Sequence, residues 1–330
     1  IRRKEFTIDQ LQASNDFYER FQSENPEEIQ PVGIKHLNLK QASAKIAARI
    51  QNQNEAVTPQ QITTEVPDSL NDAEVVHLHN HSQFSVLQST ISIKNLVAAA
   101  ADHQMPAVAI TDHGNMMGAF HFVKEIGNYN RAIRQKNKDA EAANEPADAQ
   151  EIKGIVGCEF FVCEDHTNKS QKDNGYQVVF LAKTKKGYHN LVKMSSKAYT
   201  DGFYYLPRID RKIVETYKED LIVLTGNLYG EVPSKILNVG ERQAEEALFW
   251  WKTIFGADLY VEIMRHHQED EDRVNPVLIT LAQKHQVKLV ATNNTYYIDQ
   301  EDANAHDILL CVKDGEKQAT PIGRGRGFRY

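Results

Sequence analysis

Short apolar runs alternate with amphipathic stretches from Glu74 onward, and this rhythm predicts the main domain of the chain. The apolar runs are VVHLH (75–79), AVAIT (107–111), GIVGCEFFVC (154–163), QVVFLAK (177–183), LIVLTG (221–226), DLYVEIM (258–264) and VKLVATN (287–293). Their nearly continuous apolar character is typical of parallel strands that are buried on both faces. The pattern therefore predicts seven strands in one sheet.

A helical stretch follows most of these predicted strands. The first covers IKNLVAAAAD (93–102), with Ser92 as its N-cap. The others lie near AFHFVKEIGNYN (119–130), YHNLVKMSSKAY (188–199), SKILN (234–238), AEEALFWWKTIF (244–255), NPVLITLAQKH (275–285) and DANAHDILLCV (302–312). Repeated strand–helix units predict an α/β fold whose sheet closes into a distorted seven-stranded (βα)7 barrel, with a flat doubly wound sheet as the alternative.

The first 73 residues have a different pattern. They are polar and rich in Gln, Asn and Glu, with modest helical patterns over 14–22 and 38–50. In the second of these, Leu39, Ala42, Ile46 and Ile50 form an apolar stripe. We therefore predict a helical connector over 1–51, a flexible linker over 52–73, and the barrel over 74–314.

Composition narrows the class of protein. The chain has 25% charged and 41% hydrophobic residues, which is ordinary for a globular protein, and its formal charge of −7 argues against a surface built mainly to bind nucleic acid. Its three cysteines, with no signal peptide and no long apolar run, indicate a cytoplasmic protein without disulfides or a membrane partner.

The stretch HLHNHSQFS (77–85) carries the first candidate chemistry. Successive side chains on a strand point to opposite faces, so His77, His79 and His81 would share one face. Imidazole is a common ligand of metal ions, although a polar strand tip in a surface cleft would also explain an isolated H-x-H pair.

Other strand ends strengthen the metal interpretation. Asp112 and His113 end the second predicted strand, and Glu159 lies in the third. The carboxyl ends of parallel strands meet at one edge, so these side chains would converge with His79 and His81 on one pocket. The sequence therefore predicts a metal site there, with His77 and Asp112 supporting its ligands.

Longer stretches around these residues resemble the polymerase and histidinol phosphatase (PHP) domain, in the form found at the front of the bacterial DNA polymerase III alpha subunit. The stretches are HLHNHSQFSVL (77–87), AVAITDHGNMMGAFHF (107–122), GYHNLVKMSSKAYTDGFYYLPRID (187–210), LIVLTGNLYGEVPSKIL (221–237) and LVATNNTYYIDQEDANAHDILL (289–310). The ending GRGFRY resembles the connection into the polymerase palm, which would begin at 315–330. Residues 1–50 are also similar to the joint in lineages with a fused proofreading exonuclease.

The resemblance implies a pocket for up to three metal ions, held by nine side chains. It assigns His79 and His81 to the first ion, Glu159 to a bridge between the first and second, and His113 to the third. Five of the family's ligand positions differ here, and the residues that stand there are Gln88, Gln177, Asn227, Asn294 and Tyr296. Neutral amides and phenols are poor ligands for zinc or manganese. We therefore expect no cofactor, or one weakly bound Zn, Mn or Mg ion on His79, His81 and Glu159.

The resemblance also implies a role in DNA replication. It favours a scaffold domain of a DNA-directed DNA polymerase, a nucleotidyltransferase whose palm carboxylates would lie beyond Tyr330, so that this part would be catalytically inactive. The expected partners are the palm, thumb and fingers of the alpha subunit and replisome proteins such as an exonuclease, with DNA contacted weakly if at all. The alternatives are a metal-dependent phosphoesterase or 3′–5′ proofreading exonuclease, and a pure interaction module.

Overall fold

A computed structural model of the chain describes residues 75–320. The predicted connector (1–51) and linker (52–73), and most of the predicted connection to the palm (315–330), lie outside the described residues. The elements, in chain order, are α3 (Ile93–Asp102), β1 (Ala107–Ile110), α4 (Ala119–Ala142), β2 (Lys153–Cys163), β3 (Tyr176–Ala182), α5 (Lys185–Thr200), β4 (Arg208–Asp210), α6 (Arg211–Tyr217), β5 (Leu221–Leu224), α7 (Glu231–Asn238), α8 (Glu241–Phe255), β6 (Leu259–Ile263), α9 (Glu269–His285), β7 (Lys288–Ala291) and α10 (Ala303–Asp314), with short 3-10 helices at Gly256–Asp258 and Gln300–Asp302.

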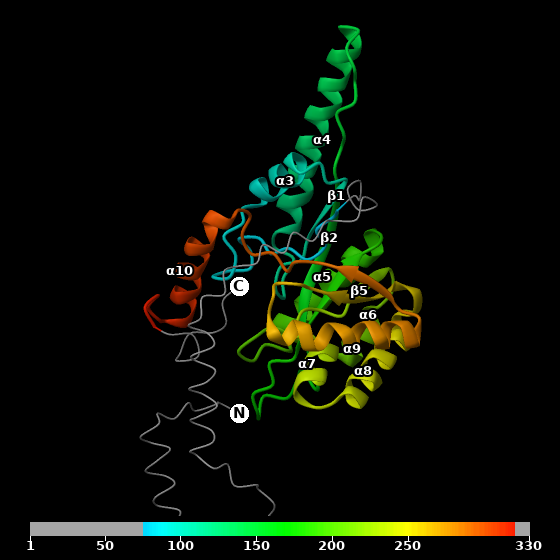
Figure 1. Ribbon diagram of the computed structural model, residues 1–330, viewed down its shortest axis with the longest axis vertical. Coiled ribbons are helices and arrows are strands. Elements are labelled where there is room, and N and C mark those ends of the chain that lie inside the picture. The colour runs from blue at the N-terminus through cyan, green and yellow to red at the C-terminus, as the bar shows by residue number, and fades with distance from the viewer. Residues whose placement is uncertain (1–74, 321–330) are drawn as a thin grey trace, which may run out of the picture. The chain divides into compact units, whose positions relative to one another are not determined.

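The strands form one curled, mixed sheet, with helices packed around it (Figure 1). Its order is β1-β2-β3-β5-β6-β7, and β4 pairs with β2 outside this path. The predicted α/β fold is confirmed. The prediction of an all-parallel sheet is wrong at β3, which pairs antiparallel with both β2 and β5. Its direction could not be read from an apolar run, because a strand buried on both faces looks the same in either orientation.

The predicted first strand, VVHLH, is not a regular strand. The segment is extended and still makes ladder-type hydrogen bonds on both sides: Ala109 N donates to His77 O (3.1 Å), and His81 N donates to Thr295 O (2.9 Å). It thereby joins β1 to the chain just after β7. The two ends of the strand path meet at this segment, which carries the H-x-H motif.

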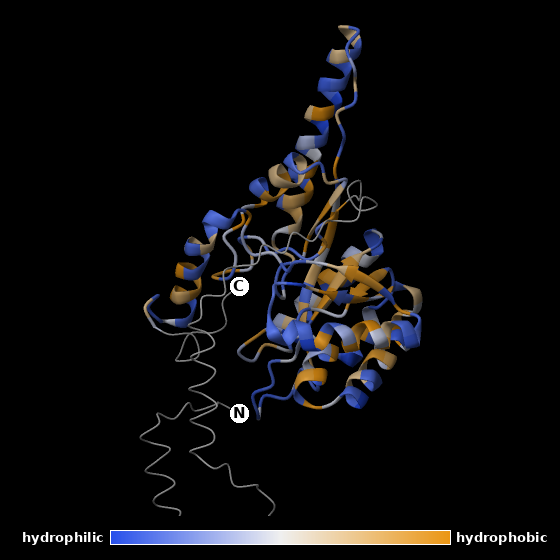
Figure 2. Cartoon of the chain, viewed as in Figure 1, coloured by the Kyte–Doolittle hydropathy of each residue, from blue (hydrophilic) through white to orange (hydrophobic). Residues whose placement is uncertain are grey.

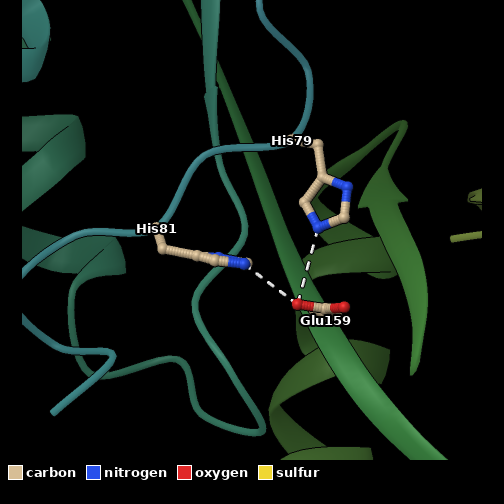
Figure 3. Close-up of side chains that lie close together, drawn as sticks. All are labelled: His79, His81 and Glu159. Carbon is tan, nitrogen blue, oxygen red and sulfur yellow. Dashed lines mark ion pairs between the residues drawn. The ribbon is translucent and has the colours of Figure 1, made fainter. Parts of the chain in front are cut away.

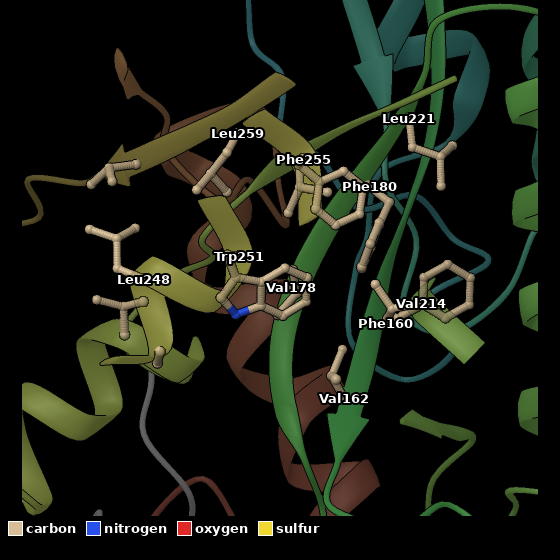
Figure 4. Close-up of a cluster of buried hydrophobic side chains, with 14 of the residues drawn as sticks. Phe160, Val162, Val178, Phe180, Val214, Leu221, Leu248, Trp251, Phe255 and Leu259 are labelled. Atoms are coloured by element: carbon tan, nitrogen blue, oxygen red, sulfur yellow. The ribbon is translucent and has the colours of Figure 1, made fainter. Parts of the chain in front are cut away.

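A large apolar core lies on the outer face of the sheet (Figure 4). Phe160 and Phe180 pack edge to face with ring centroids 5.7 Å apart, and Phe180 also contacts Trp251 of α8 at 6.1 Å. Strand alternation sends Phe160 into this core and Glu159 to the opposite face. The helices that cover the core show apolar and polar residues on opposite sides (Figure 2), as expected for amphipathic helices.

The helices largely follow the sequence pattern. Ser92 caps α3 as predicted, since its hydroxyl accepts a hydrogen bond from Asn95 N (3.1 Å). Helix α4 is longer than its predicted pattern and extends beyond the sheet (Figure 1). Asn130 and Asn137 fasten it to the returning chain, because each side chain pairs with both the N–H and the C=O of one residue, Ile152 and Ala149 respectively. None of the helices in residues 75–320 is long and apolar enough to cross a membrane.

Arg208 is a fully buried charged residue in a stretch for which the sequence predicted no helix or strand. Arg208 and Ile209 lie in β4, where no strand was predicted, and α6 follows directly. The guanidinium donates to four carbonyl oxygens, those of His166 (3.2 Å), Asn168 (2.9 Å), Asp173 (3.0 Å) and Gly202 (3.1 Å). Arg208 therefore ties the 164–175 loop and the turn after α5 to the sheet.

Replacing Arg208 tests this anchoring role. Arg208→Met leaves several carbonyl groups without donors, so we expect the free energy of unfolding to fall by about 3 kcal/mol or more. Urea denaturation measures the loss. The matched control is Arg134→Met on the exposed part of α4, which should change stability by less than about 0.5 kcal/mol. Equal, small losses in both variants would contradict the anchoring role.

Candidate metal centre

Backbone pairing brings two histidines of the motif into the interior. Asn80 lies between them, and its side-chain amide donates to His77 O and Ala109 O, both at 2.9 Å. Its own backbone accepts from Thr111 N (2.8 Å). His79 and His81, on either side of this fixed residue, are both buried and reach the inner face of the sheet.

The carboxylate of Glu159 is the centre of the site. Glu159 is fully buried, and its Oε2 lies 2.9 Å from His81 Nε2, 3.0 Å from His113 Nδ1 and 3.5 Å from His79 Nε2. Figure 3 shows His79 and His81 approaching this oxygen from the same segment. His113 arrives from the end of β1, where Gly114 N donates to Glu159 O (2.7 Å) and extends the pairing of β1 with β2.

A second buried carboxylate, Glu262 of β6, fixes the ring of His79. Glu262 Oε1 lies 2.7 Å from His79 Nδ1 and also accepts from the hydroxyl of Thr292. Carboxylates in this position orient a ligating histidine and leave its other nitrogen for a metal ion. The sequence analysis missed Glu262; the available signal was an acidic residue inside the apolar run DLYVEIM.

The charges of the cluster act on each other strongly. Burial lowers the pKa of His79, but the carboxylates of Glu262 and Glu159 outweigh burial and raise it to about 10. Burial favours a neutral Glu159, yet the neighbouring His113 and His79 lower its pKa. For His81, burial and the adjacent histidines lower the pKa well below its usual value. Without an ion, the stable state is therefore a protonated His79 between two carboxylates, with His81 neutral.

Several atoms of this cluster are buried without a hydrogen bond, including His79 Nε2, His81 Nε2 and both oxygens of Glu159. The 2.9 Å approach of His81 to Glu159 is close, but it lacks the geometry of a hydrogen bond. Buried polar atoms normally have partners, so a group of unpaired donors and acceptors around one point is a departure that a ligand would explain. The ligand atoms of His79, His81 and Glu159 all lie within 4.8 Å of one another, which suits a single divalent ion.

At two other places, residues that stand where the resemblance implies metal ligands contact each other or a predicted ligand. Tyr296 OH lies 3.0 Å from His113 Nε2, so this nitrogen is engaged within the protein, whereas His113 Nδ1 lies 3.0 Å from Glu159 Oε2 without the geometry of a hydrogen bond. Asn227 Nδ2 donates to Gln177 Oε1 (2.8 Å). Amides and phenols satisfy a polar pocket by hydrogen bonding among themselves. Among the described residues of this pocket, these contacts leave no set of strong donors for a second or third ion.

The remaining replaced positions differ in their surroundings. Gln88 turns toward α10, where its carbonyl oxygen lies 2.8 Å from His306 Nε2 and its side-chain oxygen accepts from Lys313 (3.2 Å). Asn294 is buried with both amide atoms unpaired among the described residues, and its backbone is left-handed at φ 48°. Neither supplies an anionic ligand.

Asp112 and His77, the two residues predicted to support the ligands, lie in different surroundings. Asp112 is buried beside the site, and it accepts from Ser82 N (2.7 Å), Ser82 Oγ (2.8 Å) and Ser85 Oγ (2.7 Å). Burial raises the pKa of Asp112, although these hydrogen bonds oppose the rise. It therefore shapes the loop after His81. The structure does not bring His77 into the cluster: this residue is half-buried, and the charge that acts on it is that of His103.

Comparisons with known proteins agree with this geometry. The family model of the PHP domain matches residues 77–266. The DNA polymerase III subunit alpha of Treponema pallidum is 38% identical over 251 residues, covering 74% of this chain and 20% of that protein. The corresponding subunit of Aquifex aeolicus is 36% identical over 250 residues, covering 73% of this chain and 20% of that protein. The chain thus spans about a fifth of the length of these relatives.

One similar solved structure is a histidinol phosphate phosphatase from Lactococcus lactis complexed with zinc, L-histidinol and phosphate. It is 11% identical, covers 71% of this chain and 92% of that chain, and has a TM-score of 0.34. A putative metal-dependent phosphoesterase from Bifidobacterium adolescentis is 14% identical, covers 68% of this chain and 88% of that chain, and has a TM-score of 0.39. Both scores are too low to transfer site geometry.

The structural role of Asp112 can be tested directly. Asp112→Ala leaves the hydroxyls of Ser82 and Ser85 without their buried acceptor, so we expect a loss of about 2–3 kcal/mol in the free energy of unfolding. The control is Asp139→Ala on α4, where an exposed carboxylate accepts from Gln135 (2.8 Å); its loss should stay below about 0.5 kcal/mol. An unchanged stability of Asp112→Ala would show that the loop does not depend on this carboxylate.

Glu262 should control how tightly the site holds an ion. In Glu262→Gln, His79 loses the carboxylate on Nδ1, and we expect zinc affinity to fall about 10- to 100-fold. Competition with a chromophoric chelator measures this. The matched control is Glu245→Gln. Glu245 lies on α8, away from the site, and its Oε1 atom lies 2.6 Å from Nε2 of His285 on α9. A similar loss in both variants, or none in Glu262→Gln, would contradict the role of Glu262.

Proposed function

The chain belongs to the PHP domain family, and on that premise we propose that it is the PHP-domain part of a replicative DNA polymerase III alpha subunit. In this role the domain acts as a structural scaffold whose own metal chemistry has been lost. The parent protein would be a cytoplasmic DNA-directed DNA polymerase, and the partners of this part would be the palm, thumb and fingers of the same subunit and an exonuclease of the replisome. The names of the relatives that match most of this chain support this assignment.

One observation carries the scaffold role. Positions that the family uses to bind ions are engaged in hydrogen bonds within the protein, as Gln177 is with Asn227 (2.8 Å) and Tyr296 is with His113 (3.0 Å). Hydrolysis of phosphodiesters by clustered ions needs one ion to generate hydroxide and another to stabilise the leaving oxygen. A pocket with donors for a single ion cannot hold the second ion, which would stabilise the leaving oxygen.

The site residues suit at most one ion, held by His79, His81 and Glu159. The ion would be zinc, manganese or magnesium, with zinc favoured by two imidazoles and one carboxylate. Binding at His79 Nε2 would displace the proton that the two neighbouring carboxylates stabilise there. Because a proton competes with the ion at this nitrogen, the affinity of the site rises with pH.

The second candidate function is a metal-dependent phosphoesterase or 3′–5′ exonuclease. The specific observation in its favour is the set of unpaired, buried donor atoms on His79, His81 and Glu159, because three protein ligands with an open position are what a catalytic zinc site needs. Weighing against it, among residues 75–320 no second ligand set lies in this pocket; the other group of potential ligands, Asp165, His166 and Asp210, lies at the end of β4. A nuclease and phosphatase assay separates the two functions.

We expect the full chain to show nuclease and phosphatase activity no higher than background with zinc or manganese added. The assay uses single-stranded DNA with a labelled 3′ end and a chromogenic phosphoester. The control is a variant with the family's ligands at all five replaced positions, namely Gln88→Asp, Gln177→His, Asn227→Cys, Asn294→Asp and Tyr296→His. This variant should take up more metal than any variant with a single replacement. Degradation of DNA 3′ ends by the unmodified chain, abolished in Glu159→Ala, would overturn the scaffold role.

A further inference from the structure

A small cavity is lined in part by His113, which also contacts Glu159 of the metal centre. Its volume is about 280 Å³, and its lining includes His113, Phe161 and Gln177 from the site and Lys313 from α10. The ring of Phe161 stacks on His113, with centroids 5.7 Å apart and planes 14° apart. Among the described residues, no acidic side chain lines this cavity. Its surface therefore offers aromatic faces and a cation, but no carboxylate that would repel an anion.

Three exposed aromatic side chains lie on the short segment that contributes Tyr199, Leu206 and Pro207 to the cavity lining, and form what we call the aromatic rim: Tyr199, Phe203 and Tyr205. Their exposed fractions are 42%, 47% and 64%. Tyr199, which also lines the cavity, stacks with Phe203 at a centroid distance of 6.1 Å and an angle of 19°. Single exposed aromatics are common on proteins, but three on one short segment beside a pocket mark a binding surface.

The backbone of the rim is unusual. Tyr205 has a left-handed conformation with φ 64°, which is costly for a bulky residue and is retained where the surrounding structure enforces it. Its neighbour Tyr204 donates its N–H to Leu206 O (3.1 Å) across the same tight turn. This conformation holds the ring of Tyr205 outward.

Buried contacts on both sides keep the rim rigid. Arg208 Nε donates to Gly202 O (3.1 Å), and a Cβ at Gly202 would lie 1.9 Å from Arg208 O, so only glycine permits this close packing. Pro207 packs against Gly114, where an added Cβ would lie 2.6 Å from the proline ring. A surface that is already ordered loses little entropy when a ligand binds.

Cations flank the rim at two places. Lys172 Nζ lies 5.1 Å from the centroid of the Tyr205 ring, and Lys313 reaches the cavity from the other side, where it donates to Gln88. Aromatic faces beside ammonium groups are how proteins bind single-stranded nucleic acid, since unpaired bases stack on the rings and phosphates pair with the cations. The bases of a duplex stack on each other and cannot use such a surface.

We propose that the aromatic rim, with Lys172 and Lys313, is a binding site for single-stranded DNA. Unpaired bases stack on Phe203 and Tyr205, and the backbone runs past the mouth of the cavity. The inference rests on the proposed role in DNA replication and adds to it the surface that meets the nucleic acid. Because the chain as a whole is negatively charged (formal charge −7), binding depends on this local surface and is weak and salt-sensitive.

The test is a fluorescence-anisotropy titration of the full chain with a labelled oligothymidylate of about 12 nucleotides at low salt. We use Phe203→Ala and Tyr205→Gly, the latter because glycine accepts the left-handed backbone and removes only the ring. Each variant should weaken binding by about 5- to 100-fold, since stacking on one aromatic ring is worth about 1–3 kcal/mol. Tyr205→Trp, which keeps an aromatic ring at this position, should bind as tightly as the unmodified chain.

Two controls make the result specific. Phe249→Ala removes a comparably exposed ring (59% exposed) from α8 and should leave binding unchanged. A duplex of the same length should bind all variants equally, within about twofold, because its affinity comes from phosphate contacts alone. Thermal unfolding confirms that each variant is folded.

The proposal is overturned if the rim variants bind oligothymidylate within twofold of the unmodified chain, if duplex affinity falls in parallel, or if the unmodified chain does not bind oligothymidylate at low salt. These outcomes leave the scaffold role standing, because that role is decided by the nuclease assay. Conversely, nuclease activity in the unmodified chain would overturn the scaffold role without changing the expected effect of Tyr205→Gly on binding.

Discussion

A fully buried carboxylate, that of Glu159, is the constraint around which the domain is organised. An unpaired charge in a protein interior is very costly, so it persists only where opposite charge or a metal ion surrounds it. Three imidazoles approach its Oε2 atom within 3.5 Å. They come from the extended segment before α3 and from the end of β1, which must therefore meet β2 at the same edge of the sheet. Glu262, which accepts a hydrogen bond from Thr292, contacts the ring of His79, so that β6 and the chain after β7 reach the same point.

The sequence predicted what depends on local pattern and missed what depends on long-range contacts. Apolar runs gave six of the strands approximately, and the cap at Ser92 marked the start of α3. The direction of β3 was not readable from its apolar run. The resemblance did imply a ligand position at Gln177, which opens that run. The start of β3 lies beside the metal centre only if β3 runs antiparallel to β2. The burial of Arg208 could not be predicted, because its partners are backbone carbonyls, which carry no sequence signal. The alternation that grouped His77 with His79 and His81 fails because the segment is not a regular strand.

Two pairs of side chains lie at positions where the resemblance implies metal ligands. An amide pair, Gln177 with Asn227, and a phenol–imidazole pair, Tyr296 with His113, fill places where charged ligands would need ions to neutralise them. Gln88 has gained a contact with α10 through Lys313, so the altered site also helps to hold the last helix of the described chain. Hydrogen bonds within the protein at these positions suit the proposed scaffold role, while His79, His81 and Glu159 keep unpaired atoms that suit a single ion. The exposed aromatic rim beside it offers a surface for nucleic acid that needs no catalysis.

The central claim is that this site has room for one ion and no more, and anomalous X-ray diffraction from crystals grown with excess zinc tests it most directly. The account predicts at most one strong anomalous peak in the pocket, placed between His79, His81 and Glu159, and no peak near Gln177 and Asn227. Two or three peaks in the pocket, with one bound at His113 after its hydrogen bond to Tyr296 has broken, would contradict the account.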